Sequence, residues 1–151
     1  MTLVRLLEAQ REEILGAWRR RIVATYPPEA SRSLSSEKGR FSNPVGSAIT
    51  EGTAALLDAL VRGAAADELI PLLDGIVRIR AVQDFAPSEA VGFVFLLKGA
   101  VQEVPGIREG QHGDELLAFF ARIDELALLA FDLHMRCREQ VHALRTRGTG
   151  V

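Results

Sequence analysis

Apolar residues recur at helical spacing along nearly the whole chain. Between residues 3 and 25 the repeat runs through Leu7, Ile14, Trp18 and Ile22, before the two prolines of YPPEA end the segment. The pattern therefore predicts one helix of about six turns. Residues 27–43 are rich in proline, serine and glycine, which predicts a long loop with the least order of any part of the chain.

Two further helices follow this loop. Asn43 and Pro44 are the residues typical of an N-cap and a first helical position, and an apolar side then continues to Val61. Asp67 is predicted to cap the next helix, which extends to about Phe85 and tolerates Pro71 only in or near its first turn.

The remaining sequence predicts a central helix and a long final one. Pro87 or Ser88 begins a fourth helix that is apolar over most of its circumference and reaches Val104. After the PGIREGQHGD turn, a last helix covers residues 114–147. No segment alternates apolar and polar residues as a half-exposed strand does. We therefore predict an all-α, globin-like or irregular bundle of five to six helices.

The last helix carries apolar and small residues at alternating spacings of four and three, the rhythm of a coiled coil. This seam consists of Leu116, Phe120, Ile123, Ala127, Ala130, His134, Cys137, Val141 and Leu144. At about 1.5 Å per residue the helix would be roughly 50 Å long, more than one small domain needs. The seam thus predicts a dimerisation and output helix, and the alternative is a solvated helix end with chance spacing. Since no further ligand lies at helical spacing from His134 and Cys137, core packing is the better interpretation than a metal site.

Three polar residues share the buried arc of the third helix. On a helical wheel Arg80, Gln83 and Asp84 lie among its leucines and isoleucines. Arg80 and Asp84 are four residues apart and can pair, and Gln83 can donate and accept beside them. One interpretation is a structural network that joins the corner at Pro87 to the RFSNP segment containing Asn43. The other is a polar pocket or switchable ion pair.

Composition bounds the remaining possibilities. The 151 residues, 48% of them hydrophobic, are predicted to form one domain over residues 1–147, with a disordered tail at 148–151. A formal charge of −2 gives no general attraction to nucleic acid. The one cysteine excludes an internal disulfide. Without a signal peptide or an apolar run of about 20 residues, a cytoplasmic protein with no membrane span is expected.

Motifs for catalysis are missing from the sequence. It contains no glycine-rich phosphate loop, CxxC pair, HExxH or nucleophile elbow, and the third helix offers no histidine for haem. We therefore expect a protein that is not an enzyme and has no metal or other cofactor. The alternative is a small-molecule carrier or enzyme with a pocket between the third and fourth main helices.

Three segments resemble one protein family in their order and spacing: RFSNPVGSAITEG (40–52), LLDGIVRIRAVQDFAPSEAVGFVFLLK (72–98) and IDELALLAFDLHMRCREQV (123–141). They are similar to the amino-terminal domain of RsbRD-type proteins, the RsbT co-antagonists of the bacterial stressosome. The resemblance implies a haem-free globin-like fold that forms homodimers. It also implies a sensory input role, with STAS-domain and kinase signalling proteins as partners.

Together these observations predict a dimeric sensory or regulatory domain of stress signalling. A change near Arg80, Gln83 and Asp84 would alter how the last helix packs against its dimer mate. The helix would then pass the signal to a partner or a downstream domain.

Overall fold

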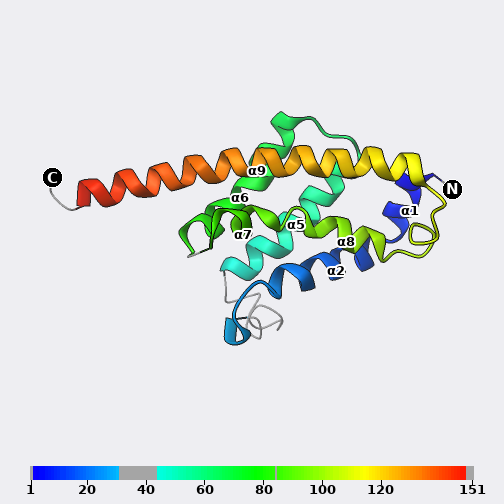
Figure 1. Cartoon of the computed structure of the whole chain (residues 1–151), viewed down its shortest axis with the longest axis horizontal. Helices are drawn as coiled ribbons and strands as arrows, with labels where there is room; N and C mark the ends of the chain where they lie inside the picture. Colours follow the sequence, from blue (N-terminus) through cyan, green and yellow to red (C-terminus); the bar gives the residue numbers. More distant parts are fainter. Residues whose placement is uncertain (1, 31–43, 84, 149–151) are drawn as a thin grey trace.

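The computed structural model describes residues 2–30, 44–83 and 85–148. Seven helices and no strand occur in this part of the chain, which confirms the all-α prediction (Figure 1). The helices are α1 (Leu3–Ala9), α2 (Arg11–Val23), α5 (Pro44–Val61), α6 (Ala66–Val82), α7 (Pro87–Gly92), α8 (Leu96–Gln102) and α9 (Gly113–Gly148). Most of the predicted loop, including Asn43, lies outside the described residues, and so does the tail beyond Gly148.

The first predicted helix is in fact two. The backbone of Gln10 leaves helical geometry, with φ −102° and ψ 19°, and separates α1 from α2. Its amide still donates to the Leu6 carbonyl and its carbonyl still accepts from the Ile14 amide, both at 3.0 Å. The chain therefore bends here without leaving these backbone groups unpaired. The bend is a local change that the apolar spacing does not report.

The third predicted helix differs from α6 at both ends. Ala65 rather than Asp67 occupies the N-cap, and Asp67 lies in the first turn, where a carboxylate interacts favourably with the helix dipole. Pro71 lies inside the helix, beyond the first turn, with its ring exposed. The helix ends at Val82, before the predicted Phe85.

The fourth predicted helix is also divided. A turn at residues 93–95 separates α7 from α8, although much of this segment is buried, as expected for a central one. Phe93, Val94 and Leu97 all face the core, while Phe95 points outward. The expected count of five to six helices thus rises because two predicted helices are each broken once.

Helix α9 runs along the whole molecule and packs on α6, α7 and α8, while α2 packs on α5 and α8 (Figure 1). At its start, the Leu3 amide donates to Glu115 Oε2 at 3.0 Å and joins the amino terminus to α9. Helices α5 and α6 approach closely, because a Cβ added to Gly52 would lie 2.7 Å from the side chain of Ile76. The carboxy-terminal turns of α9 extend past the rest of the molecule (Figure 1).

Candidate functional site

The guanidinium of Arg80 lies inside the core, with 1% of the residue exposed. Its Nε donates to the Ala90 carbonyl at 3.1 Å, and its Nη2 donates to the Glu89 carbonyl at 2.8 Å. Both terminal nitrogens also lie 3.4 Å from Thr25 Oγ1. The fork of donors that arginine carries is thus directed mainly at the backbone of α7.

These carbonyls need a side-chain donor because α7 ends early. In a continued helix Glu89 and Ala90 would accept from the amides of Phe93 and Val94. Both of those amides instead point to the Val91 carbonyl. Arg80 therefore supplies donors that the break in the helix removes, to the buried carbonyl of Ala90 and the part-buried carbonyl of Glu89.

Trp18 of α2 does the same on the other side of the break. Its Nε1 donates to the Phe93 carbonyl at 2.8 Å, in a buried position. The usual helical donor to that carbonyl, the Leu97 amide, bonds to Val94 instead. Two long side chains, from α6 and α2, thus stabilise the α7–α8 break through specific hydrogen bonds.

Aromatic rings surround the buried guanidinium. Its central carbon lies 4.2 Å from the ring centre of Phe85, 5.4 Å from that of Tyr26 and 5.7 Å from that of Phe93. Burial lowers the pKa of Arg80, and the neighbouring Tyr26 opposes this effect. The ring faces offset part of the cost of removing the cation from water.

Of the predicted polar trio, the structure brings Arg80 and Gln83 into one network through a tyrosine. The Tyr26 hydroxyl donates to Gln83 Oε1 at 3.0 Å, and its ring stacks edge-on against Phe85 at 5.2 Å. Asp84 and Asn43 lie outside the described residues, so the expected pairing of Arg80 with Asp84 stays a prediction. The sequence pattern did not indicate Tyr26, because the contact joins residues 57 positions apart.

The predicted seam of α9 lies largely within the single chain. Phe120 and Val141 are half-buried and Leu144 is exposed. The central members are buried in the fold, where α9 packs on α6 and α7: Ile123, Ala127, Ala130, His134 and Cys137. A helix packed in its own bundle repeats apolar residues in the same rhythm as a coiled coil, so the spacing alone could not tell which helices it contacts.

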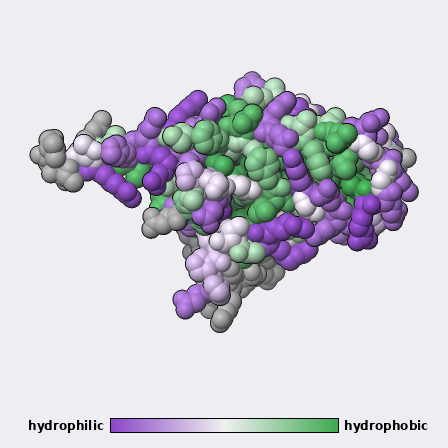
Figure 2. All heavy atoms as spheres, in the orientation of Figure 1, coloured by the Kyte–Doolittle hydropathy of each residue, from purple (hydrophilic) through white to green (hydrophobic). Residues whose placement is uncertain are grey.

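A second row of residues, one position further along α9, faces outward with the same rhythm. We call Leu117, Ala121, Asp124, Leu128, Phe131 and Met135 the outer stripe. Its four large apolar members are between 42% and 69% exposed. Figure 2 shows hydrophobic residues on the face of the molecule along which α9 runs.

The one charge in the outer stripe is neutralised within the chain. Lys98 of α8 pairs with Asp124 at 2.6 Å, and its ammonium lies 5.4 Å from the ring centre of Phe95 and 5.5 Å from that of Phe120. Phe95, which precedes α8 and is 47% exposed, thus adds to the exposed apolar surface near Asp124. Contiguous exposed apolar surfaces are typical of interaction sites.

His134 and Cys137 are buried side by side on the inner face of α9. His134 Nδ1 has no hydrogen-bond partner among the described residues, and the pKa of the imidazole is lowered by burial and by Arg138. Burial also raises the pKa of the Cys137 thiol. Among the residues that the structure describes, no group of three or more histidine, cysteine, aspartate or glutamate side chains is placed to hold a metal ion.

We expect stability to fall as the pH drops below the ordinary histidine value of about 6.5. The folded chain resists protonation of His134 because its pKa is lowered, whereas the unfolded chain takes up the proton freely, so acid favours unfolding. Arg138 and, on α6, Arg78 and Asp74 are the charged groups near this part of α9. Urea unfolding between pH 7.5 and 5.5 measures how steeply the free energy of unfolding falls with pH. His134→Leu should make this fall less steep, whereas His142→Gln, on the exposed side, should leave it unchanged. Equal slopes in the two variants would contradict the assignment.

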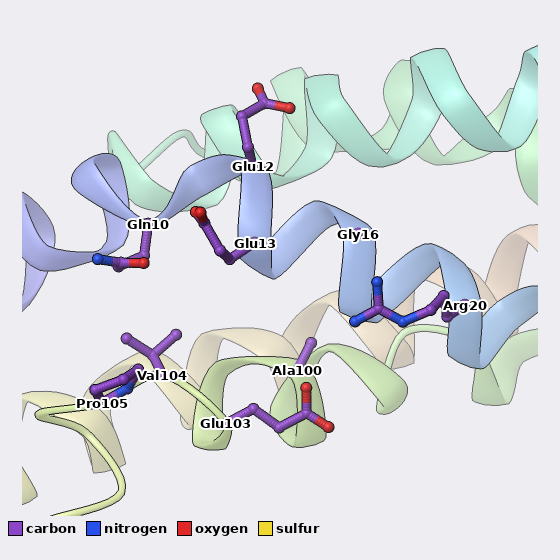
Figure 3. A pocket seen from close by; sticks show the side chains of 9 residues that line it. All are labelled: Gln10, Glu12, Glu13, Gly16, Arg20, Ala100, Glu103, Val104 and Pro105. Carbon is purple, nitrogen blue, oxygen red and sulfur yellow. The ribbon is translucent and has the colours of Figure 1, made fainter.

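A groove of about 260 Å³ lies between the start of α2 and α8. Figure 3 shows Gln10, Glu13 and Arg20 opposite Glu103 and Val104, across a gap with small residues at Gly16 and Ala100. The Glu103 carboxylate already pairs with Arg21 at 2.6 Å. The residues that line this groove come from α2, α8 and the turn after α8, and not from α6, so it is not the pocket predicted between the third and fourth helices.

One protein-family model matches nearly the whole chain. It is the N-terminal domain of the RsbT co-antagonist protein rsbRD, and it matches residues 12–148. The chain belongs to this family. The RsbRD match begins at α2 and includes the α7–α8 break and all of α9. Neither the comparison with curated proteins nor that with solved structures finds a match.

Membership in the RsbRD N-terminal family implies a sensory or regulatory input role in stressosome signalling, with stressosome proteins as partners. The family is a regulatory one. Within the described residues, every helix is too short or too polar to span a membrane. The globin-like topology that the resemblance implies stays an expectation, because it rests on the family and not on a structural match.

Proposed function

We propose that residues 1–147 act as one non-enzymatic, dimeric input domain of cytoplasmic stress signalling, with α9 as its output helix. The observation that carries this proposal is the two-sided character of α9, together with the RsbRD match. One face of the helix belongs to the core of the domain, and the other is an exposed apolar stripe. A change inside the domain can therefore reach a partner through a single rigid element.

The α7–α8 break supplies the part of the domain that can change. Its carbonyls are held by Arg80 and Trp18 instead of by helical amides. Helix α7 contacts both α6 and α9. A signal that shifts these side chains would move α7 against α9, and α9 would transmit the shift past the end of the domain.

The test replaces a residue of the outer stripe in the protein as it exists in its cell. Leu128→Glu should leave folding intact, because Leu128 is 68% exposed, and should abolish the rise in stress-gene transcription after a stress challenge. Val82→Glu is the matched control, since Val82 is 63% exposed on α6. A normal stress response in a folded Leu128→Glu protein would overturn the proposal.

A further inference from the structure

We infer that protonation of His134 releases the carboxy-terminal turns of α9 from the domain, so that the chain responds to acid. This inference rests on the proposed function in taking α9 as the output helix, and it names the signal that the helix carries. Histidine is the side chain whose ordinary pKa lets it gain a charge between about pH 8 and 5. The position of His134 decides what that charge does to the fold.

The imidazole of His134 is enclosed on the inner face of α9. The residue is 1% exposed, and its Nδ1 has no hydrogen-bond partner among the residues that the structure describes. A neutral imidazole needs only one donor and one acceptor bond, whereas an imidazolium carries a full charge and two donors. Burying an unpaired charge costs far more free energy than burying an unpaired neutral group. The packed position of α9 therefore favours the neutral form.

The charged groups around His134 do not stabilise an imidazolium. Arg138, one turn further along α9, lowers the pKa of His134 together with burial. On α6 the charged groups near this part of α9 are Asp74 and Arg78, which already pair with each other at 3.3 Å. The charged residue of α7 is Glu89, which is exposed and accepts from the backbone at the start of its own helix. No free carboxylate on these elements is thus placed to hold a protonated His134.

His134 lies where α9 leaves the domain. The preceding turns are held by apolar residues buried on the same face: Ile123, Leu126, Ala127, Ala130 and Leu133. Beyond His134, Cys137 is the last buried residue among the described side chains, Val141 is half-buried, and the others up to residue 146 are exposed. A loss of packing at His134 therefore frees the final turns, which extend past the rest of the molecule, while the earlier turns stay attached (Figure 1).

The size of the response follows from proton linkage. In the released helix the imidazole meets water, and its pKa returns to about 6.5. Protonation of the released form alone multiplies its population by about 1.1 at pH 7.5 and by about 11 at pH 5.5. The released population should therefore rise by up to about tenfold as the pH falls through this interval. Local opening of a helix end needs far less free energy than global unfolding, so this rise occurs within the folded chain.

Cys137 reports the release, because it is the single cysteine of the chain, lies three residues from His134 and is 5% exposed. An aromatic disulfide labels its thiol between pH 7.5 and 5.5. Each rate is divided by that of the urea-unfolded chain at the same pH, which cancels the titration of the thiol itself. We expect the normalised rate to rise by up to about tenfold in the wild type and in His142→Gln. It should stay constant in His134→Leu and His134→Asn, which cannot take up the proton.

Low concentrations of urea separate local release from global unfolding. Local opening exposes little surface, so the labelling rate of Cys137 should change little with urea. A rate that rises with urea as steeply as the global unfolding equilibrium would show that Cys137 reacts only in the unfolded chain, and would overturn the inference. Circular dichroism shows which variants are folded, and the wild-type profiles alone can contradict the inference where a variant is not.

Two further results would also overturn the inference. One is a normalised rate that does not change with pH in the wild type, and the other is an equal rise in the folded His134 variants. Neither result affects the stress-response test of Leu128→Glu, which asks whether the outer stripe carries the output. Conversely, a normal stress response in Leu128→Glu together with acid-dependent labelling of Cys137 would contradict the proposed function and leave the release of α9 standing.

Discussion

Arg80→Leu is expected to lower the free energy of unfolding by about 2–5 kcal/mol, the largest effect of a single substitution that removes no large apolar group. The variant leaves the buried carbonyl of Ala90 and the part-buried carbonyl of Glu89 without the Arg80 donors, and an unpaired buried group costs about 1–3 kcal/mol. The leucine is apolar and fits among Tyr26 and Phe85, so the loss reports on the hydrogen bonds more than on packing. Urea unfolding at neutral pH measures it.

Two comparison variants make this prediction specific. Arg80→Lys keeps the charge but not the planar fork of donors, so its free energy of unfolding should lie between those of the wild type and Arg80→Leu. Trp18→Phe removes one donor, to the Phe93 carbonyl, and should cost about 1–3 kcal/mol. If Arg80→Leu lost less than Trp18→Phe, the guanidinium would not be what holds the α7–α8 break.

Ile123→Ala is expected to lower the free energy of unfolding by about 2–5 kcal/mol, because Ile123 is fully buried on the inner face of α9. The loss combines the apolar contacts with the cavity left behind. Leu128→Ala, on the outer stripe, should change the free energy of unfolding of the monomer by less than about 0.5 kcal/mol. Denaturation at protein concentrations too low for association measures both, and equal losses would contradict the assignment of the two faces.

The helices themselves could be predicted from the sequence, because apolar spacing directly reflects which side of a helix is buried. Their breaks could not. Gln10 carries no proline or glycine signal, and at the turn of residues 93–95 only the preceding Gly92 interrupts an otherwise apolar run. Arg80 and Trp18 bond the carbonyls on either side of this turn. Trp18 lies 75 positions from Phe93, and even Arg80 lies on the preceding helix, so the apolar pattern around the turn does not report these contacts.

The candidate site was predictable in part for the same reason. The helical wheel placed Arg80 on the buried arc, but the partners of a buried arginine depend on which segments the fold brings to it. Here they are backbone carbonyls of the next helix and the ring of Tyr26, and neither carries a sequence signal. On α9 the spacing of apolar residues correctly predicted a buried face. A heptad rhythm does not say whether that face packs within its own chain or against another chain.

The central claim is that one face of α9 packs in the core of its own domain and the other face binds a second chain. Sedimentation of two variants at micromolar concentration tests it most directly. Ile123→Ala, or the milder Ile123→Val if the first unfolds, should remain a dimer despite its lower stability. Leu128→Glu should be a folded monomer. A wild-type chain that sediments as a monomer, or a Leu128→Glu variant that stays dimeric, contradicts the account.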